Sequence, residues 1–230
     1  MCGRFTLRSP VESIASLFDG LAMPEWKPRF NIAPTQPVAC VRHRNGSTAV
    51  DLLRWGLVPS WAKDLGIGAR MINARGETVA SKPAFRNAFR TRRCLVLADG
   101  FYEWKKIGKQ KYPFYITRPD DMPFCMAGLW ETWGPANQSV ETCTIITTEA
   151  NATLQPLHER MPVILGPDVY DFWLDTQFAD ETRYQELLRP VPENDLVMRE
   201  VSQVVNKVAN DSPACIEPKA TLFDGPPKDG

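Results

Sequence analysis

The sequence predicts a single α+β domain whose strands form an antiparallel sheet or a distorted barrel. Short runs of β-forming residues recur at hairpin spacing, most densely from residue 94 onward, and turn residues such as Gly108 separate them. Helical periodicity is confined to a few short segments, and neither a strand–helix–strand alternation nor an internal repeat is present. With 230 residues, of which 43% are hydrophobic, the chain is long enough to bury one large core.

The first half of the chain is expected to mix helices, a long loop and short strands. Ser9, Pro10 and Glu12 form a capping-box pattern that begins a helix, and Gly20 ends it. A proline-rich loop covers residues 23–37. The elements expected next are strands at 38–42, 49–58 and 70–75, followed by a helix at 77–89.

The second half is predicted to be mostly β-structure. Apolar runs bounded by turn residues predict strands at 94–98, 101–106, 112–117, 123–130 and 142–148. Two helices are expected at 168–174 and 180–188, and a last strand at 196–201. Residues 1–216 should form the domain, and 217–230, which are poor in apolar side chains, a flexible tail.

Composition and spacing exclude several classes of protein. No run approaches 18 consecutive apolar residues, so no membrane-spanning helix is expected, and the N-terminus lacks the pattern of a signal peptide. No two of the six cysteines are closer than 18 residues, which argues against a zinc knuckle and fits reduced thiols. We expect a cytoplasmic monomer that uses no metal and no cofactor.

The charge is divided unevenly along the chain although its formal sum is zero. Residues 1–69 carry 8 basic and 5 acidic side chains, residues 70–118 carry 12 and 3, and residues 119–230 carry 7 and 19. A basic first half beside an acidic second half predicts a surface that faces a polyanion. The alternative is that both signs interleave once the chain has folded.

Cys2 has chemistry that depends on its position. Initiator methionine is normally removed before a small residue, which would leave a terminal cysteine whose amine and thiol are adjacent. The amine can capture an aldehyde as an imine, and the thiol can then close a five-membered thiazolidine. Alternatively the thiolate is a nucleophile with its own amine as base, or the cysteine is incidental.

Two short segments carry further candidates for catalysis or binding. In INARGE, an extended backbone would put Asn73 and Arg75 on one face, where an amide and a guanidinium suit a phosphate-bearing ligand. In DGFYEWKK, Glu103 lies among aromatic residues, a setting that raises a carboxyl pKa toward acid–base use. The alternatives are residues that brace a turn and a solvated strand carboxylate.

The segment LHERMP contains His158 and Arg160, which fit proton transfer and phosphate contact, although a lone histidine is more often structural. Trp55 and Trp61 precede the basic segment, and aromatic rings beside arginines can stack on nucleic-acid bases. Most tryptophans, however, belong to the core.

Six motifs in a fixed order resemble the SRAP family, the SOS-response-associated peptidases or abasic-site-processing proteins. They are MCGR, RFNIAPTQ, RWGLVPSWA, INARGET, DGFYEWKK and LHERMP, and VSQVVNKV matches the family's closing element. The resemblance runs from the N-terminus to about residue 206. It implies a distorted β-barrel flanked by helices, and a covalent trap for abasic sites in single-stranded DNA and at single-to-double-strand junctions.

The resemblance also implies roles for individual residues. The family's exposed catalytic cysteine falls on Cys2 after removal of the initiator methionine, and the other catalytic positions fall on Asn73, Glu103 and His158. The residues implied in DNA binding are Arg4, Arg75 and Arg160 at phosphates and Asn31 and Pro34 in the pocket. An AP-lyase side reaction and a self-processing peptidase activity are also implied.

Two other function classes remain open from the sequence. The MCG start resembles class II glutamine amidotransferases, in which a terminal cysteine hydrolyses an amide. That hypothesis accounts for Cys2 but not for the basic segment or the other five motifs. The second is a non-covalent module for single-stranded DNA in which Cys2 is incidental.

Overall fold

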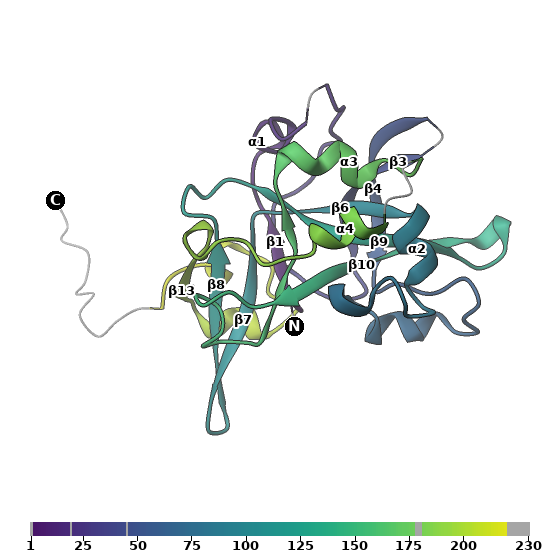
Figure 1. The fold of residues 1–230 in the computed structure, drawn as a ribbon. Coiled ribbons are helices and arrows are strands. Elements are labelled where there is room, and N and C mark those ends of the chain that lie inside the picture. The colour runs from purple at the N-terminus through teal and green to yellow at the C-terminus, as the bar shows by residue number, and fades with distance from the viewer. Residues whose placement is uncertain (1, 19, 45, 178–180, 220–230) are drawn as a thin grey trace.

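Two β-sheets with short helices at their margins make up the fold in the computed structural model (Figure 1). The structure describes residues 2–18, 20–44, 46–177 and 181–219. The predicted α+β class is confirmed. None of the helices in these ranges is long and apolar enough to cross a membrane.

The smaller sheet has five strands in the order β13-β8-β7-β1-β2, all of them antiparallel to their neighbours. Their bounds are β1 Phe5–Leu7, β2 Arg29–Ile32, β7 Gly100–Ile107, β8 Gln110–Thr117 and β13 Val197–Glu200. Consecutive strands β7 and β8 form the hairpin predicted from the Gly108 turn, where φ is +60°. In this sheet the N-terminal strand β1 lies between β7 and β2.

The larger sheet has eight strands, and five of them, β10, β4, β3, β6 and β9, close a ring because β10 pairs with both β4 and β9. Its strands are β3 Pro37–Arg44, β4 Ser47–Trp55, β5 Asn73–Arg75, β6 Arg93–Ala98, β9 Phe124–Trp133, β10 Val140–Glu149, β11 Arg160–Pro162 and β12 Ile164–Leu165. The ring stands where a distorted antiparallel barrel was expected. It is not uniformly antiparallel, since β4 and β5 both run parallel to β10.

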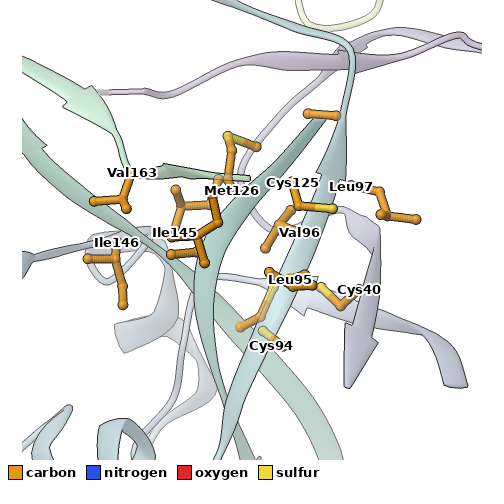
Figure 2. Packing of buried hydrophobic residues seen from close by; sticks show 14 of the residues in the cluster. Cys40, Cys94, Leu95, Val96, Leu97, Cys125, Met126, Ile145, Ile146 and Val163 are labelled. Carbon is orange, nitrogen blue, oxygen red and sulfur yellow. The ribbon is translucent and has the colours of Figure 1, made fainter. Parts of the chain in front are cut away.

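The core lies inside this ring and between the sheets. Every residue of β6 is buried, and after Arg93 at its start the strand is a continuous apolar run rather than an alternating one. Figure 2 shows Cys40 of β3 and Cys94 of β6 among the aliphatic side chains that fill the interior. All six cysteines are free and buried, which agrees with reduced thiols used as small hydrophobic side chains.

Two helix predictions are wrong in detail, each for a local physical reason. The first helix, α1 (Val11–Ala15), has no side-chain cap, because the Ser9 hydroxyl donates to the buried carboxylate of Asp99 at 2.9 Å. The helix expected at 77–89 is a 3-10 turn followed by α2 (Arg86–Thr91). Pro83 lies between them and cannot donate the backbone hydrogen bond that a continuous helix needs.

The later elements follow the prediction more closely. Helices α3 (Tyr170–Leu174) and α4 (Glu181–Glu186) lie within the two predicted helices, and residue 180 lies outside the described residues. Short strands β1, β2, β11 and β12 were not predicted. At the predicted tail, the Lys219 amide donates to the Glu200 carbonyl at 3.2 Å, and residues 220–230 lie outside the described part.

Candidate functional site

Pairing between β1 and β7 brings the N-terminal segment alongside Glu103. Phe5 lies opposite Phe101, and the Tyr102 amide donates to the Arg4 carbonyl at 2.9 Å. Because the strands are antiparallel, the residues before β1 continue along β7 toward its middle, where Glu103 is only 5% exposed. A carboxyl group at the sheet centre therefore lies next to Cys2.

Asn73 fixes the backbone of Cys2 from the other sheet. Strand β5 pairs in parallel with β10, and the Asn73 Nδ2 atom donates to the Cys2 carbonyl oxygen at 2.9 Å. The Asn73 Oδ1 atom is buried and accepts no hydrogen bond from the described residues. The amide thus anchors the terminal cysteine through one atom and presents an acceptor with the other.

Burial sets the electrostatics of Cys2 and Glu103. The Cys2 side chain is wholly buried, and this burial, followed by the charge of Glu103, raises the pKa of the thiol far above its usual range. Burial likewise raises the pKa of the Glu103 carboxyl. The expectation of an exposed cysteine is therefore wrong for the chain that still carries the initiator methionine.

His158 is held in one tautomer by its own chain. The backbone N–H of Arg160 donates to His158 Nδ1 at 2.9 Å, so in the neutral ring the proton resides on Nε2. Burial lowers the pKa of His158, which favours this neutral form near pH 7. The ring is therefore suited to donate a proton or a hydrogen bond from Nε2.

Arg75, His158 and Arg160 line a cleft of about 680 Å³, whereas Cys2, Asn73 and Glu103 do not line it. Strand β10 assembles this wall, since Thr147 lies opposite Arg75 of β5 and Glu149 lies opposite Arg160 of β11. Arg75 is exposed and two positions from Asn73, so both project to one side of β5. Among the described residues no group of three or more His, Cys, Asp or Glu side chains could hold a metal ion.

Arg160 is engaged within the protein. Its guanidinium donates to both carboxylate oxygens of Glu77, at 2.6 and 2.9 Å, and to the Thr147 carbonyl at 2.6 Å. The bonds to Arg160 lower the pKa of Glu77. The sequence analysis assigned Glu77 no role. No local pattern predicts its pairing with Arg160, because the two residues are 83 positions apart. Here Glu77 and Arg160 clamp the turn that carries His158.

Replacement of Glu77 by Gln should separate affinity from chemistry. If the site binds DNA and reacts with it, the unpaired Arg160 should bind single-stranded DNA several-fold more tightly, because a phosphate replaces the lost carboxylate. The covalent step should slow by about 10-fold, or about 1.4 kcal/mol in barrier, because the His158 turn is loosened. Fluorescence anisotropy and single-turnover kinetics measure the two effects.

Glu149→Gln is the matched control for this prediction, because Glu149 lines the same cleft and its loss changes the charge equally without breaking the Arg160 pair. Glu77→Asp should restore most of the rate. Equal rates in the Glu77→Gln and Glu149→Gln variants would contradict the positioning role of Glu77.

Other predicted binding residues lie in different settings. Trp61 is 62% exposed and, with Lys63 and Arg70, lines a second cleft of about 530 Å³. Trp55 does not fit its predicted role, because its ring is fully buried against Phe5. A nucleic-acid base cannot stack on a ring that has no exposed surface.

Asn31 and Arg4 are tied to the C-terminal segment. The Asn31 amide donates to the carbonyls of Val205, Lys207 and Asn210 and is wholly buried, so it stabilises the fold rather than lining a pocket. Arg4 donates to Asn31 Oδ1 at 2.7 Å and to the Val205 carbonyl at 2.9 Å. Pro34 is half-buried and does not line the His158 cleft.

Comparisons with known proteins agree with this architecture. A family model described as SOS response associated peptidase (SRAP) matches residues 1–208. The chain is 41% identical over 222 residues to the abasic site processing protein YoqW of Bacillus subtilis, over 94% of this chain and 99% of that protein. It is 31% identical over 225 residues to the abasic site processing protein YedK of Escherichia coli, over 95% of this chain and 100% of that protein.

The fold is also found among solved structures. A protein from Bacteroides thetaiotaomicron superposes with a TM-score of 0.81 at 23% identity, over 95% of this chain and 100% of that chain, a likeness that shows the fold alone. The match of the family model to most of the chain bears on family membership as well as on the fold. Together with the relatives above 30% identity, it establishes that the protein belongs to the SRAP family.

Proposed function

We propose that this protein processes abasic sites in single-stranded DNA by capturing them as a covalent adduct of Cys2. The observation that carries the proposal is the hydrogen bond of 2.9 Å from Asn73 to the Cys2 carbonyl, beside the buried carboxyl of Glu103. The abasic lesion is also what the curated relatives are named for. A terminal amine, a thiol and a proton donor fit one substrate class, an aldehyde.

The first step joins the amine to the sugar. Removal of the initiator methionine leaves a free Cys2 amine, whose ordinary pKa is about 7.7–8.0. His158 and Glu103 transfer protons while the sugar hemiacetal opens to its aldehyde. The amine nitrogen then forms a bond to C1′, and the carbonyl oxygen becomes a hydroxyl group. The product is a carbinolamine.

The second step expels water and closes the ring. The protonated Glu103 carboxyl, favoured by its raised pKa, gives a proton to the departing hydroxyl, so water leaves and a protonated imine forms, in which the nitrogen keeps its hydrogen. The Glu103 carboxylate then accepts the Cys2 thiol proton, which the raised thiol pKa makes necessary. Sulfur bonds to C1′, the electron pair of the C=N double bond returns to nitrogen, and a thiazolidine results with net loss of one water and with Glu103 protonated again.

The cleft that Arg75, His158 and Arg160 line would hold the flanking DNA. Arg75 is exposed there and can contact phosphate directly, while Arg160 serves chiefly to position the His158 turn through Glu77. Asn73 Oδ1 would accept a hydrogen bond from the adduct nitrogen. Trp61 is placed in the second cleft, where an exposed ring can stack on a base.

Further parts of the proposal concern side reactions and context. An imine at C1′ permits β-elimination at the neighbouring phosphate, so AP-lyase activity is proposed as a minor reaction. Peptidase activity would consist of removing the initiator methionine or releasing the adduct. The protein is proposed to act as a cytoplasmic monomer, associated with the nucleoid in a bacterial cell.

The test uses two single-stranded oligonucleotides that differ in one functional group. One carries an abasic site, and the other carries the same site after borohydride reduction to an alcohol, which cannot form an imine. A band shifted on a denaturing gel, stable to heat and detergent, should appear with the first only. A shift with both or with neither would refute aldehyde capture, and ammonia release from glutamine would favour the amidotransferase hypothesis instead.

A further inference from the structure

Strand β1 reaches the site through a short ladder of backbone pairs. Two of its three residues, Phe5 and Thr6, are paired in register with β7. On its other side, the pairing with β2 shifts register between Phe5 and Leu7. A slip of one residue would reverse the face on which every side chain of a strand lies. The approach of Cys2 to Glu103 therefore needs a further contact that fixes this register.

A buried carboxylate holds the end of β1. Asp99 is wholly buried, and its Oδ1 atom accepts a hydrogen bond from the Thr6 hydroxyl. Its Oδ2 atom accepts from the backbone N–H groups of Arg8 and Ser9, the latter at 2.7 Å, and from the Ser9 hydroxyl at 2.9 Å. The Asp99 amide in turn donates to the Thr6 carbonyl at 3.0 Å. We name these contacts between Asp99 and residues 6–9 the Asp99 clamp.

The Asp99 clamp lies where the chain passes from one sheet to the other. Asp99 stands between the last residue of β6, in the larger sheet, and the first residue of β7, in the smaller sheet. It lies four positions before Glu103 on the same segment. Thr6 lies four positions after Cys2. Because β1 and β7 are antiparallel, the clamp fixes one end of a strand pair whose other end brings Cys2 to Glu103.

Tyr115 supports the Asp99 clamp from strand β8. Its hydroxyl oxygen lies 2.8 Å from Thr6 Oγ1, and the ring is buried. The ring reaches Thr6 by lying directly over Gly100, where an added Cβ would be 2.4 Å from the Tyr115 hydroxyl oxygen. The Arg8 Nε atom lies 3.9 Å from Asp99 Oδ1 and supplies a positive charge. Close packing and hydrogen bonds together hold the carboxylate in one place.

Stability alone is a weak reason to bury this carboxylate. A charged group loses its hydration on burial, and apolar side chains of similar volume often stabilise a fold as well or better. The best-attested use of a buried, paired polar group is to fix the register of the elements it joins. Asp99 lines neither the cleft that holds His158 nor the cleft that holds Trp61, so it is not placed to contact DNA.

We propose that Asp99 is a positioning residue of the covalent reaction, which holds β1 in the register that sets the Cys2 amine and thiol beside Glu103. The inference rests on the proposed function, which assigns the chemistry to those two residues. A slip of one residue along β7 would move Cys2 by about 3.4 Å. Proton transfer needs hydrogen-bond distance, and a misplacement of about 1 Å can cost about 100-fold in rate.

The test compares Asp99→Asn and Thr6→Val with wild type on a single-stranded abasic oligonucleotide. Asparagine loses one of the two acceptor oxygens, and valine keeps the shape of threonine without its hydroxyl group. Each variant should slow the maximal single-turnover rate of adduct formation by at least about 10-fold. The Kd for an undamaged strand, measured by anisotropy, should stay within about 2-fold, because the substitutions are remote from the clefts. Thr6→Ser keeps the hydroxyl group and should restore most of the rate.

A double-mutant cycle with Glu103 distinguishes alignment from general destabilisation. Once Glu103→Gln has removed the proton donor and acceptor, loss of the Asp99 clamp has little left to misalign. Thr6→Val should therefore slow the Glu103→Gln protein by less than about 2-fold, against at least about 10-fold in the wild-type background. A merely structural role would slow both backgrounds by the same factor.

Thr142→Val is the matched control for Thr6→Val. Thr142 is also a wholly buried strand threonine, and its hydroxyl accepts from the Val58 amide at 2.9 Å and donates to the Glu131 carbonyl at 3.3 Å. It lies on β10 in the larger sheet. Its replacement should lower the thermal unfolding temperature as Thr6→Val does, but leave the rate of adduct formation unchanged. The same unfolding curves show that each variant is folded at the assay temperature.

The outcomes separate this inference from the proposed function. Wild-type rates in the Asp99→Asn and Thr6→Val proteins would overturn the positioning role, as would equal slowing in Thr142→Val or equal factors in the two backgrounds of the cycle. If Asp99→Asn does not fold, the Thr6 variants decide. The proposed function fails instead if wild-type protein forms no adduct with the abasic oligonucleotide, a result that does not depend on Asp99.

Discussion

Cys2→Ala should abolish the covalent adduct, leaving no band above the protein-free background on a denaturing gel. The alanine variant keeps a terminal amine, so an imine can still form, but no sulfur is present to close the ring. Imines hydrolyse in water, and the complex would dissociate when heated. Reduction with borohydride during the reaction should trap this imine and restore a stable band. Gel densitometry with and without borohydride measures both parts.

Two controls test the chemistry of the terminus. Cys215→Ala removes another buried thiol, one that donates to the Asn210 carbonyl at 3.3 Å, and should leave adduct formation unchanged. A variant with an uncleaved residue before Cys2 keeps the thiol but blocks the amine, and should form no adduct. An undiminished band in either the Cys2→Ala protein or the blocked protein would contradict the thiazolidine.

Glu103→Gln should slow adduct formation by about 10²- to 10⁴-fold, the range typical of a positioned acid or base. Glutamine preserves the size of the side chain but can neither give a proton to the leaving hydroxyl nor accept one from the thiol. Single-turnover kinetics across pH measure the effect. The wild-type rate should fall as pH rises through the raised pKa of Glu103, and the variant should lack this fall.

Glu103→Gln should slow adduct formation but increase the stability of the folded protein. Because burial raises the folded pKa of Glu103, the folded state binds the extra proton between about pH 4.3, the ordinary value, and the raised one. Wild-type stability therefore falls as pH rises through this window, and the Glu103→Gln protein lacks that loss. At neutral pH the variant should be more stable by about 1 kcal/mol in urea unfolding, because glutamine removes a buried charge that the functional site retains at a cost in stability.

Glu131→Gln is the matched control for Glu103. Glu131 is also a buried strand carboxylate, but it pairs with Arg92 at 2.8 Å, so its loss should destabilise the fold and leave the adduct rate unchanged. If Glu103→Gln and Glu131→Gln slowed the reaction equally, a structural effect would explain both. A destabilised Glu103→Gln protein at neutral pH would contradict the electrostatic interpretation.

Elements with local signals were predicted well. The strands at 101–106 and 112–117 appear as β7 and β8, because alternation and a glycine turn act between residues close in sequence. The helix expected at 77–89 failed on an equally local feature, Pro83, which periodicity alone does not weigh. The short strands β1 and β12 have too few residues to be identified without their partners.

The candidate site also combines features that the sequence predicts with features that only the fold decides. Cys2, Asn73, Glu103 and His158 were predicted from residue type and motif order. The exposed fraction of each side chain in the fold then distinguished the two predicted aromatic residues. Trp61 is on the surface and Trp55 is in the core, although both belong to one motif. Strand alternation predicts which residues share a face, but not which face the rest of the chain covers.

The sequence by itself determined which reactive groups this protein carries and the order in which they occur. Only the tertiary structure decided which of them meet. Cys2 reaches Glu103 because β1 pairs with β7, and Glu77 reaches Arg160 because β5 and β11 both pair with β10. These pairings join residues up to about a hundred positions apart, and their energy comes from burying the sheets around one core, which no local pattern encodes.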